Sequence, residues 1–236
     1  MRLDKYLAEM GVGTRSQVKQ YIRKCCVTVN GELVRQSDAQ IAPETDEICY
    51  NGQTVGYAAF EYYMLNKPAG VISASEDKKQ ETVIDLIDTR LRKDLFPVGR
   101  LDKDTEGLLL ITNDGALTHQ LLSPKKHVSK RYFARIDGKV TEREVKVFRE
   151  GVAIDEDFTA LPAELDILIS DDISEIEVVI YEGKFHQIKR MFEAVGMEVI
   201  YLKRLSMGNL LLDGHLGLGE YRPLTEEELA GLRAHE

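Results

Sequence analysis

The chain has 236 residues, 43% of them hydrophobic and 30% charged, and carries a formal net charge of −9. This length accommodates one large domain or a large and a small one, and the ordinary globular composition excludes a disordered or fibrous chain. No apolar run reaches the length of a membrane span, the start MRLDKYLAEM lacks the apolar core of a signal peptide, and the three cysteines are odd in number, so we expect a cytoplasmic protein that contacts no membrane.

The first sixty residues have the pattern of a small separate module. Apolar residues between Leu3 and Leu7 have the spacing of a short helix, and Thr14 is placed to cap a second helix over Arg15 to Arg23. A β-prone run follows, and Asn30-Gly31 is a two-residue turn signal between two short strands. The pattern predicts two helices followed by a hairpin.

One face of the second helix is basic. Its cations recur at helical spacing and are Arg15, Lys19, Arg23 and Lys24. Residues 1 to 35 hold seven Lys or Arg against three acids, and local potential rather than net charge attracts phosphate. A basic helix alone is usually a solvated face. The segment RLDKYLAEMGVGTRSQVKQYIRKCCVTVNG as a whole, however, resembles the alpha-L RNA-binding module first described in a small-subunit ribosomal protein. The resemblance implies an RNA-binding domain over residues 1–57 whose four cations contact RNA, and Cys25 stands where relatives often have Gly.

A second domain is expected over residues 58–236. A strand is predicted over Tyr62 to Asn66 and a turn after it, and apolar residues between Thr82 and Arg92 have helical spacing. Leu108 to Ile111 has the composition of a strand buried in a sheet, and Asn113-Asp114-Gly115 is a turn signal that ends it.

Five charged residues stand directly before that buried strand, within the stretch PVGRLDKDTEGLLLITNDG. They are Arg100, Asp102, Lys103, Asp104 and Glu106. A charged loop held by a rigid sheet is a usual place for catalysis, although an isolated Asp in a loop is more often only a turn former. Lys103 lies between the acids and no compact ligand array is present, so we expect no divalent metal.

The same stretch resembles the signature of the RNA pseudouridine synthases, in which a Gly-Arg-Leu-Asp loop precedes a Gly-Leu-Leu-Leu strand. By this resemblance Asp102 is the catalytic carboxylate, and Asp104 and Glu106 are solvated acids of the turn. Arg100, two residues earlier, is expected to hold a flanking phosphate or to help displace the base. Related synthases also carry an Asn-Lys-Pro-x-Gly segment, which matches residues 66–70.

The basic stretch SPKKHVSKRYFARIDG runs into a predicted strand over Tyr132 to Ile136. A tyrosine in a strand usually only packs. Family members carry Lys-x-Tyr at this place, and the match Lys130-Arg131-Tyr132 implies that Tyr132 offers its ring to the target base and that Lys130 contacts RNA.

A helix over Glu142 to Glu150 is predicted next, because Thr141 and Glu144 form a capping-box pattern. From residue 150 to residue 182 there are eleven acids and no Lys or Arg. We expect this acidic stretch to be solvated surface that ends in a strand over Ile176 to Tyr181.

The segment YEGKFHQIKRMFEAVG has the last strong pattern. An apolar stripe predicts a core-facing helix, and its members are Ile188, Met191, Phe192 and Val195. The opposite side, which includes Arg190 and Glu193, has the plain interpretation of a solvated helix face. By the family resemblance, His-Gln-Ile-Lys places the cation of Lys189 beside Asp102, and His186 and Gln187 contact the RNA.

The resemblance implies an α+β fold in which the small RNA-binding domain precedes a catalytic domain with a mixed, mostly antiparallel sheet flanked by helices. It implies isomerisation of uridine to pseudouridine with no cofactor. The uridine leaves its stack and lies against Tyr132, while Lys189 keeps Asp102 ionised in a dry pocket. Three roles stay open for the carboxylate: attack on the ribose, attack on the base, and removal of a ribose proton.

A Ser-Pro-x-x-His loop at Ser123 to His127, together with HQIKRMF and EYRPLTEEE, most resembles the branch that modifies uridine 516 of 16S rRNA. A 23S rRNA target is the alternative. We therefore expect a monomer whose partner is 16S rRNA in a small-subunit assembly intermediate. Two other classes stay open: a non-catalytic RNA-binding ribosome-assembly factor, and a carboxylate-based glycoside hydrolase, which requires a second catalytic acid.

Overall fold

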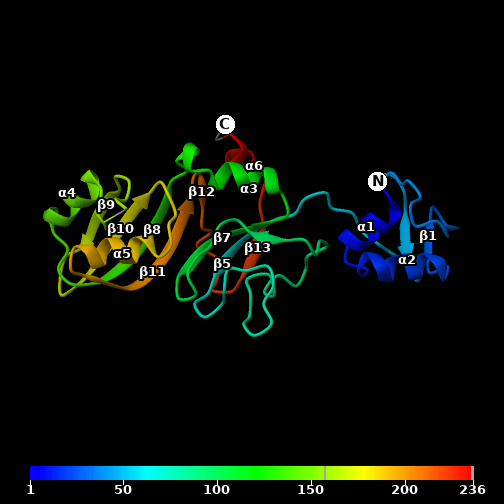
Figure 1. The fold of residues 1–236 in the computed structure, drawn as a ribbon, viewed down its shortest axis with the longest axis horizontal. Coiled ribbons are helices and arrows are strands. Elements are labelled where there is room, and N and C mark those ends of the chain that lie inside the picture. The colour runs from blue at the N-terminus through cyan, green and yellow to red at the C-terminus, as the bar shows by residue number, and fades with distance from the viewer. Residues whose placement is uncertain (157, 235–236) are drawn as a thin grey trace. The chain divides into compact units, whose positions relative to one another are not determined.

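The computed structural model describes residues 1–156 and 158–234. They form two compact units (Figure 1). The N-terminal unit comprises Met1–Glu61 and Ile87–Leu95, and the C-terminal unit comprises Tyr62–Leu86 and Phe96–Glu236. Within the described ranges, none of the helices combines the length and the apolar character that a membrane crossing requires.

The N-terminal unit packs two helices on a small antiparallel sheet of strand order β2-β1-β3-β4. Its elements are α1 (Leu3–Glu9), α2 (Arg15–Arg23), β1 (Val27–Val29), β2 (Glu32–Leu33), β3 (Ile48–Tyr50) and β4 (Gln53–Thr54). Thr14 begins α2 with a capping box, in which its backbone N–H donates to Gln17 Oε1 at 2.8 Å. Both predicted helices and the predicted hairpin are confirmed, since local capping and turn signals specify them.

The turn between α2 and β1 is formed by Cys25, whose φ of 59° lies in the left-handed region. Glycine enters this region freely, whereas a side chain costs about 1–2 kcal/mol there. Cys25 therefore adopts a backbone conformation that favours glycine.

The helix predicted over Thr82 to Arg92 is wrong. The Thr82 N–H and hydroxyl both donate to Asp85 Oδ2, at 2.9 and 2.8 Å, and the segment after this contact forms a turn rather than a helix. From Ile87 to Leu95 the chain belongs to the N-terminal unit, where the buried Arg92 pairs with Asp94 at 2.6 Å. The apolar residues of this stretch do not share one helix face, since Val83 is buried in the C-terminal unit, Ile87 belongs to the N-terminal unit, and Leu91 is exposed.

The C-terminal unit is built on a nine-stranded sheet with the order β13-β5-β7-β11-β8-β10-β9, to which β6 and β12 add as short strands. The strands are β5 (Tyr62–Lys67), β6 (Phe96–Pro97), β7 (Glu106–Thr112), β8 (Lys130–Asp137), β9 (Glu164–Ile169), β10 (Ile173–Ile180), β11 (Glu198–Met207), β12 (Leu210–Leu211) and β13 (Tyr221–Pro223). Among the named strands of the described ranges, only β7 and β11 pair in parallel. The expected mixed and mostly antiparallel sheet is confirmed.

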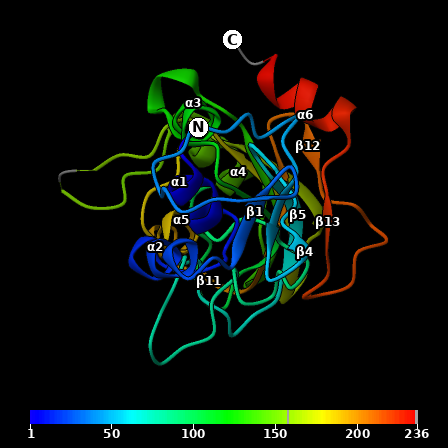
Figure 2. The ribbon, with the colours of Figure 1, turned by 90° about the vertical axis from the view of Figure 1, so that its right-hand side faces the viewer.

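Helices cover both halves of this sheet. They are α3 (Gly115–Leu122), α4 (Glu142–Glu150), α5 (Gln187–Ala194) and α6 (Glu226–Arg233), with a 3-10 turn at Pro124–Lys126. Leucines of α3 and α6 pack into one core cluster with Met64 of β5 and Leu108 of β7. Figures 1 and 2 show both helices along the upper side of the C-terminal unit. On the other half, Phe148 of α4 packs against Phe192 of α5 at a ring-centroid distance of 4.8 Å.

The acidic stretch from 150 to 182, expected to be solvated surface that ends in one strand, contains the strand β9 in addition to β10. Acids of β10 face cations of the adjacent β8: Glu177 pairs with Arg131 and Glu175 with Arg135, both at 3.0 Å. Two segments of opposite charge in the sequence therefore offset each other across a strand pair.

The parallel pairing of β7 with β11 depends on Gly107. A β-carbon there would lie 2.3 Å from the Arg204 carbonyl oxygen, and the φ of Gly107 is +100°. We expect Gly107→Ala to lower the free energy of unfolding by about 2–5 kcal/mol, because it adds backbone strain to a steric overlap. Chemical denaturation followed by circular dichroism measures the change. Gly115→Ala is the control, since no atom lies within 4 Å of its added carbon. Equal stability of the two variants would contradict this role of Gly107.

Candidate active site

The loop between β6 and β7 carries Asp102, and the buried Lys67 holds it in place. Lys67 is fully buried at the end of β5, and its Nζ donates to the carbonyl oxygens of Pro68, Lys103 and Thr105 at 2.9, 3.2 and 2.9 Å. Burial lowers the pKa of Lys67 to about 8. A second anchor is the Ser73 hydroxyl, which donates to the carbonyl oxygen of Leu101 at 2.9 Å and accepts from its N–H at 3.0 Å. The backbone on either side of Asp102 is thus fixed.

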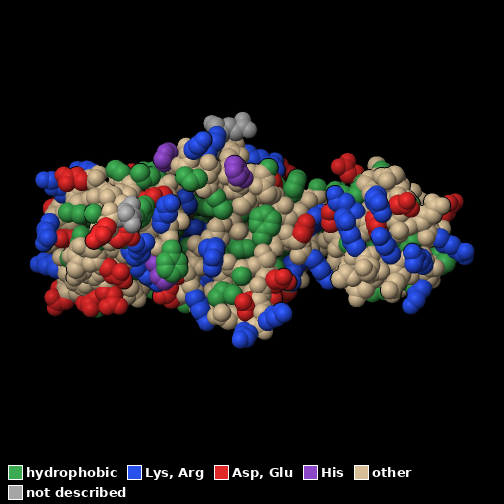
Figure 3. Space-filling view, viewed as in Figure 1, with side chains coloured by type: hydrophobic (Ala, Val, Ile, Leu, Met, Phe, Trp, Pro, Cys, Tyr) green, Lys and Arg blue, Asp and Glu red, His purple; other side chains and the backbone are tan. Residues whose placement is uncertain are grey.

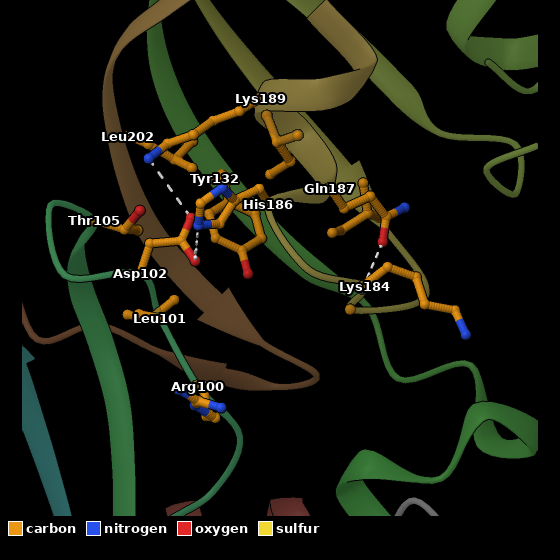
Figure 4. A pocket seen from close by; sticks show the side chains of 13 residues that line it. Arg100, Leu101, Asp102, Thr105, Tyr132, Lys184, His186, Gln187, Lys189 and Leu202 are labelled. Carbon is orange, nitrogen blue, oxygen red and sulfur yellow. Dashed lines mark hydrogen bonds and ion pairs between the residues drawn. The ribbon is translucent and has the colours of Figure 1, made fainter. Parts of the chain in front are cut away.

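Asp102 lies in a small pocket of about 60 Å³ that brings together β8, β11, the loop and the start of α5. Lys189 Nζ lies 3.6 Å from Asp102 Oδ2, and His186 Nε2 lies 3.6 Å from Oδ1 (Figure 4). Tyr132 and Leu202 line the same pocket. The residues that the sequence singled out from three distant segments therefore meet around one carboxylate.

The ammonium group of Lys189 is shared between two carboxylates. It donates to Asp104 Oδ1 and Oδ2 at 2.7 and 2.8 Å, closer than its 3.6 Å contact with Asp102. This hydrogen bond lowers the pKa of Asp104. Asp104 is exposed, as expected of a solvated acid, although it pairs with Lys189, whereas Glu106 is only partly exposed and accepts a hydrogen bond from the Tyr201 hydroxyl at 2.7 Å. Both acids are tied to elements that surround the pocket.

Tyr132 forms part of the pocket wall and is only 7% exposed. Its strand β8 pairs with β10 and β11, placing Tyr132 opposite Val178 and Arg204. Apolar side chains, those of Leu202, Ile180 and Ile188, line the pocket with it. A flat ring in such surroundings offers a stacking surface to a planar base.

His186 and Gln187 begin α5 but have different surroundings. His186 caps the helix with a left-handed backbone, φ 49°, and its imidazole faces Asp102 (Figure 4). Gln187 is buried, where its amide donates to Glu182 at 2.8 Å and accepts from the Lys184 N–H at 3.0 Å. The Gln187 side chain therefore fixes the turn that positions His186.

A wider groove of about 860 Å³ adjoins the pocket, and Asp102 and His186 line both. Arg100 is exposed and also lines both. Lys130 lies in the groove wall but is buried, and its Nζ donates to the Val128 carbonyl at 2.8 Å. Burial, with the nearby Arg204, lowers the pKa of Lys130 to about 8. Of Arg100 and Lys130, both predicted to contact RNA, Arg100 is thus the more accessible.

The predicted cations of α2 are at the surface of the N-terminal unit. Arg15 and Lys19 line a hollow of about 220 Å³ together with Lys5 of α1, Arg2 at the N-cap of that helix, and Asp4, which pairs with Arg2 at 2.9 Å. Arg23 and Lys24 are exposed at the end of the helix. Figure 3 shows Lys and Arg side chains gathered on the visible face of this unit.

Two parts of the site have no clear signal in the sequence. The loop-holding role of Lys67 is missed, although a lysine inside the apolar strand YYMLNK is a hint of a buried cation with backbone partners. The pairing of Asp104 with Lys189 joins residues 85 positions apart, and no local pattern predicts it.

Comparison with known proteins agrees with this arrangement. Residues 61–194 match the family model of RNA pseudouridylate synthase, and residues 1–48 match that of the S4 domain. The chain is 47% identical over 231 residues to the uncharacterized RNA pseudouridine synthase YtzG of Bacillus subtilis (strain 168), covering 97% of each. It is 38% identical over 235 residues to ribosomal small subunit pseudouridine synthase A of Escherichia coli (strain K12), covering 98% of this chain and all of the relative. A crystal structure of a pseudouridylate synthase, at 40% identity, matches 98% of this chain and 99% of that chain with a TM-score of 0.69. The chain therefore belongs to the RNA pseudouridine synthase family and carries an S4 domain at its N-terminus.

Proposed function

We propose that this enzyme converts uridine 516 of 16S rRNA to pseudouridine, with Asp102 as the catalytic carboxylate and Tyr132 as the ring that stacks on the displaced base. The observation that carries the proposal is the approach of Lys189 and His186 to the two oxygens of Asp102, beside Tyr132. An ionised carboxylate flanked by apolar side chains such as Leu202 and Ile188 is stabilised by such counter-charges.

The reaction rearranges bonds without a change in oxidation state. The bond from uracil N1 to ribose C1′ breaks, the base turns, and a bond from C5 to C1′ forms. The proton at C5 is lost, and N1 gains one. All three possible roles of Asp102 require its ionised form, and the fixed loop keeps the carboxylate in position with little reorganisation.

The choice of target rests on the relatives. Proteins of Haemophilus influenzae and Escherichia coli that are 40% and 38% identical to this chain are named ribosomal small subunit pseudouridine synthase A. Their lengths are covered almost completely. The small-subunit RNA is therefore the preferred substrate, 23S rRNA is the alternative, and we propose that the enzyme acts as a monomer on a subunit-assembly intermediate.

The test measures tritium release from 16S and 23S transcripts labelled at uridine C5. We expect release from 16S rRNA, corresponding to one uridine per transcript, at position 516. Release from 23S rRNA alone would overturn the target assignment. If no tritium is released from 16S rRNA, 23S rRNA or small-subunit precursors although the protein binds them, the result would favour a non-catalytic assembly factor. A glycoside hydrolase is excluded by family membership.

We further propose that residues 1–57 bind RNA and that residues 58–236 hold the catalytic machinery. Replacing Arg15, Lys19 and Arg23 by Gln is expected to weaken RNA binding. The logarithm of the association constant falls with the logarithm of the salt concentration, and we expect this fall to become shallower by about 2–3 in slope, because each phosphate contact releases about 0.7–0.9 counterion. Filter binding at several salt concentrations measures this slope. The same charge change at the exposed Arg143, Lys146 and Arg149 of α4 is the control. Equal slopes for both triple variants would refute the assignment of α2.

A further inference from the structure

Phe185 is the most exposed of the large apolar residues in the described ranges, at 76%. It nevertheless has a fixed neighbour, because its ring stacks on the His186 imidazole with centroids 3.8 Å apart and planes 17° apart. One face of a flat aromatic ring is thus supported from below. The roles proposed for Asp102, Tyr132 and Lys189 do not involve the Phe185 ring.

The position of Phe185 links it to the catalytic pocket. His186, on which the ring stacks, places its Nε2 3.6 Å from Asp102 Oδ1. Phe185 lines the 860 Å³ groove but not the 60 Å³ pocket that holds Tyr132. The small pocket holds the Tyr132 ring against which the displaced base is proposed to lie, whereas the groove extends beyond it to Phe185 and has space for adjoining nucleotides.

The chemistry of the groove around Phe185 favours a nucleic-acid strand. Arg100, His127 and Lys184 line it with Phe185, and they supply groups that bind phosphate. Stacking on an aromatic side chain is available to every base, since each base has a π-face. Aromatic rings interleaved with cations are the usual lining of a channel for single-stranded RNA.

We propose that Phe185 is a stacking platform for a nucleobase that directly neighbours the target uridine in the RNA strand. This inference rests on the proposed rRNA-modifying function. When the uridine leaves its stack, its neighbour loses a stacking partner, and the Phe185 ring replaces it. The platform stabilises the opened strand beside Asp102 and makes the rate depend on the base at that neighbouring position.

The test compares the protein with Phe185→Ala and Phe185→Tyr variants on 16S rRNA assembled by ligation of a synthetic segment around the target. The segment carries the natural base or an abasic ribose at the nucleotide on the 5′ or the 3′ side. We expect Phe185→Ala to lower kcat/KM about tenfold on natural RNA, and Phe185→Tyr to retain activity. With an abasic neighbour at one of the two positions, the wild-type enzyme and Phe185→Ala become equal.

Leu168→Ala is the control, because Leu168 is 53% exposed on β9 and does not line the groove. A loss in Phe185→Ala that persists with either abasic neighbour would overturn the proposal and leave Phe185 only a support for His186. Unchanged activity of Phe185→Ala on natural RNA would overturn it as well. If the assignment of 16S rRNA as the target is wrong, the wild-type enzyme itself is inactive on this RNA, which distinguishes that failure from a failure of the Phe185 proposal. The same variants are then compared on the RNA that the enzyme does modify.

Discussion

Replacing Asp102 by Asn is expected to slow pseudouridine formation by at least ~10³-fold while the fold and the affinity for RNA stay unchanged. The two side chains have nearly the same shape, but Asn carries no negative charge and cannot act as nucleophile or base. Lys189 keeps its hydrogen bonds to Asp104 at 2.7 and 2.8 Å, so the start of α5 remains anchored in the variant. The loss is therefore chemical rather than structural.

Single-turnover kinetics at saturating enzyme measure this effect without a contribution from binding. Asp104→Asn is the matched control, because it removes the neighbouring carboxylate and leaves the 3.6 Å contact of Lys189 with Asp102. We expect this control to retain most of the activity. Comparable losses of rate in Asp102→Asn and Asp104→Asn would mean that catalysis depends on the total negative charge of the loop rather than on the Asp102 carboxylate itself.

Replacing Lys67 by Met is expected to affect both stability and catalysis. The substitution leaves three carbonyl oxygens without the amino group that they bind, two of them in the loop that carries Asp102. A buried group that loses its partner costs about 1–3 kcal/mol, and we expect a total loss of about 2–4 kcal/mol in the free energy of unfolding. A displaced Asp102 lowers kcat/KM by about 10²-fold, because small shifts of a reacting group are costly.

Urea denaturation and steady-state kinetics measure the two losses of the Lys67→Met variant. Lys103→Met is the control, since Lys103 lies in the same loop but is exposed, and its amino group donates to the exposed Gln80 side chain at 2.9 Å. A Lys67→Met protein with the stability and rate of the Lys103→Met protein would show that the loop needs no such anchor.

Local signals predicted much of the fold. The capping boxes at Thr14 and Thr141 specified the first residues of α2 and α4. The apolar run at Leu108 to Ile111 became the centre of β7, and the stripe after His186 became α5. In each case a few neighbouring residues determine the outcome, so a pattern in the sequence is sufficient.

Features that depend on distant contacts were missed. Residues 82–92 have helical spacing, yet they pass between two units, and periodicity does not reveal which core a residue joins. The paired charges of β8 and β10 depend on strand register. For the candidate site, the family motifs indicated Asp102, Tyr132 and Lys189, whereas the sharing of Lys189 with Asp104 follows only from the folded arrangement.

The most direct test of Asp102-dependent uridine isomerisation is to map pseudouridine on 16S rRNA after reaction with the wild-type or the Asp102→Asn enzyme. Carbodiimide modification followed by reverse transcription locates the modified base. We predict one new stop, for position 516, with the wild-type enzyme, and none with Asp102→Asn at equal RNA occupancy. The same stop at the same rate with both enzymes would contradict the account.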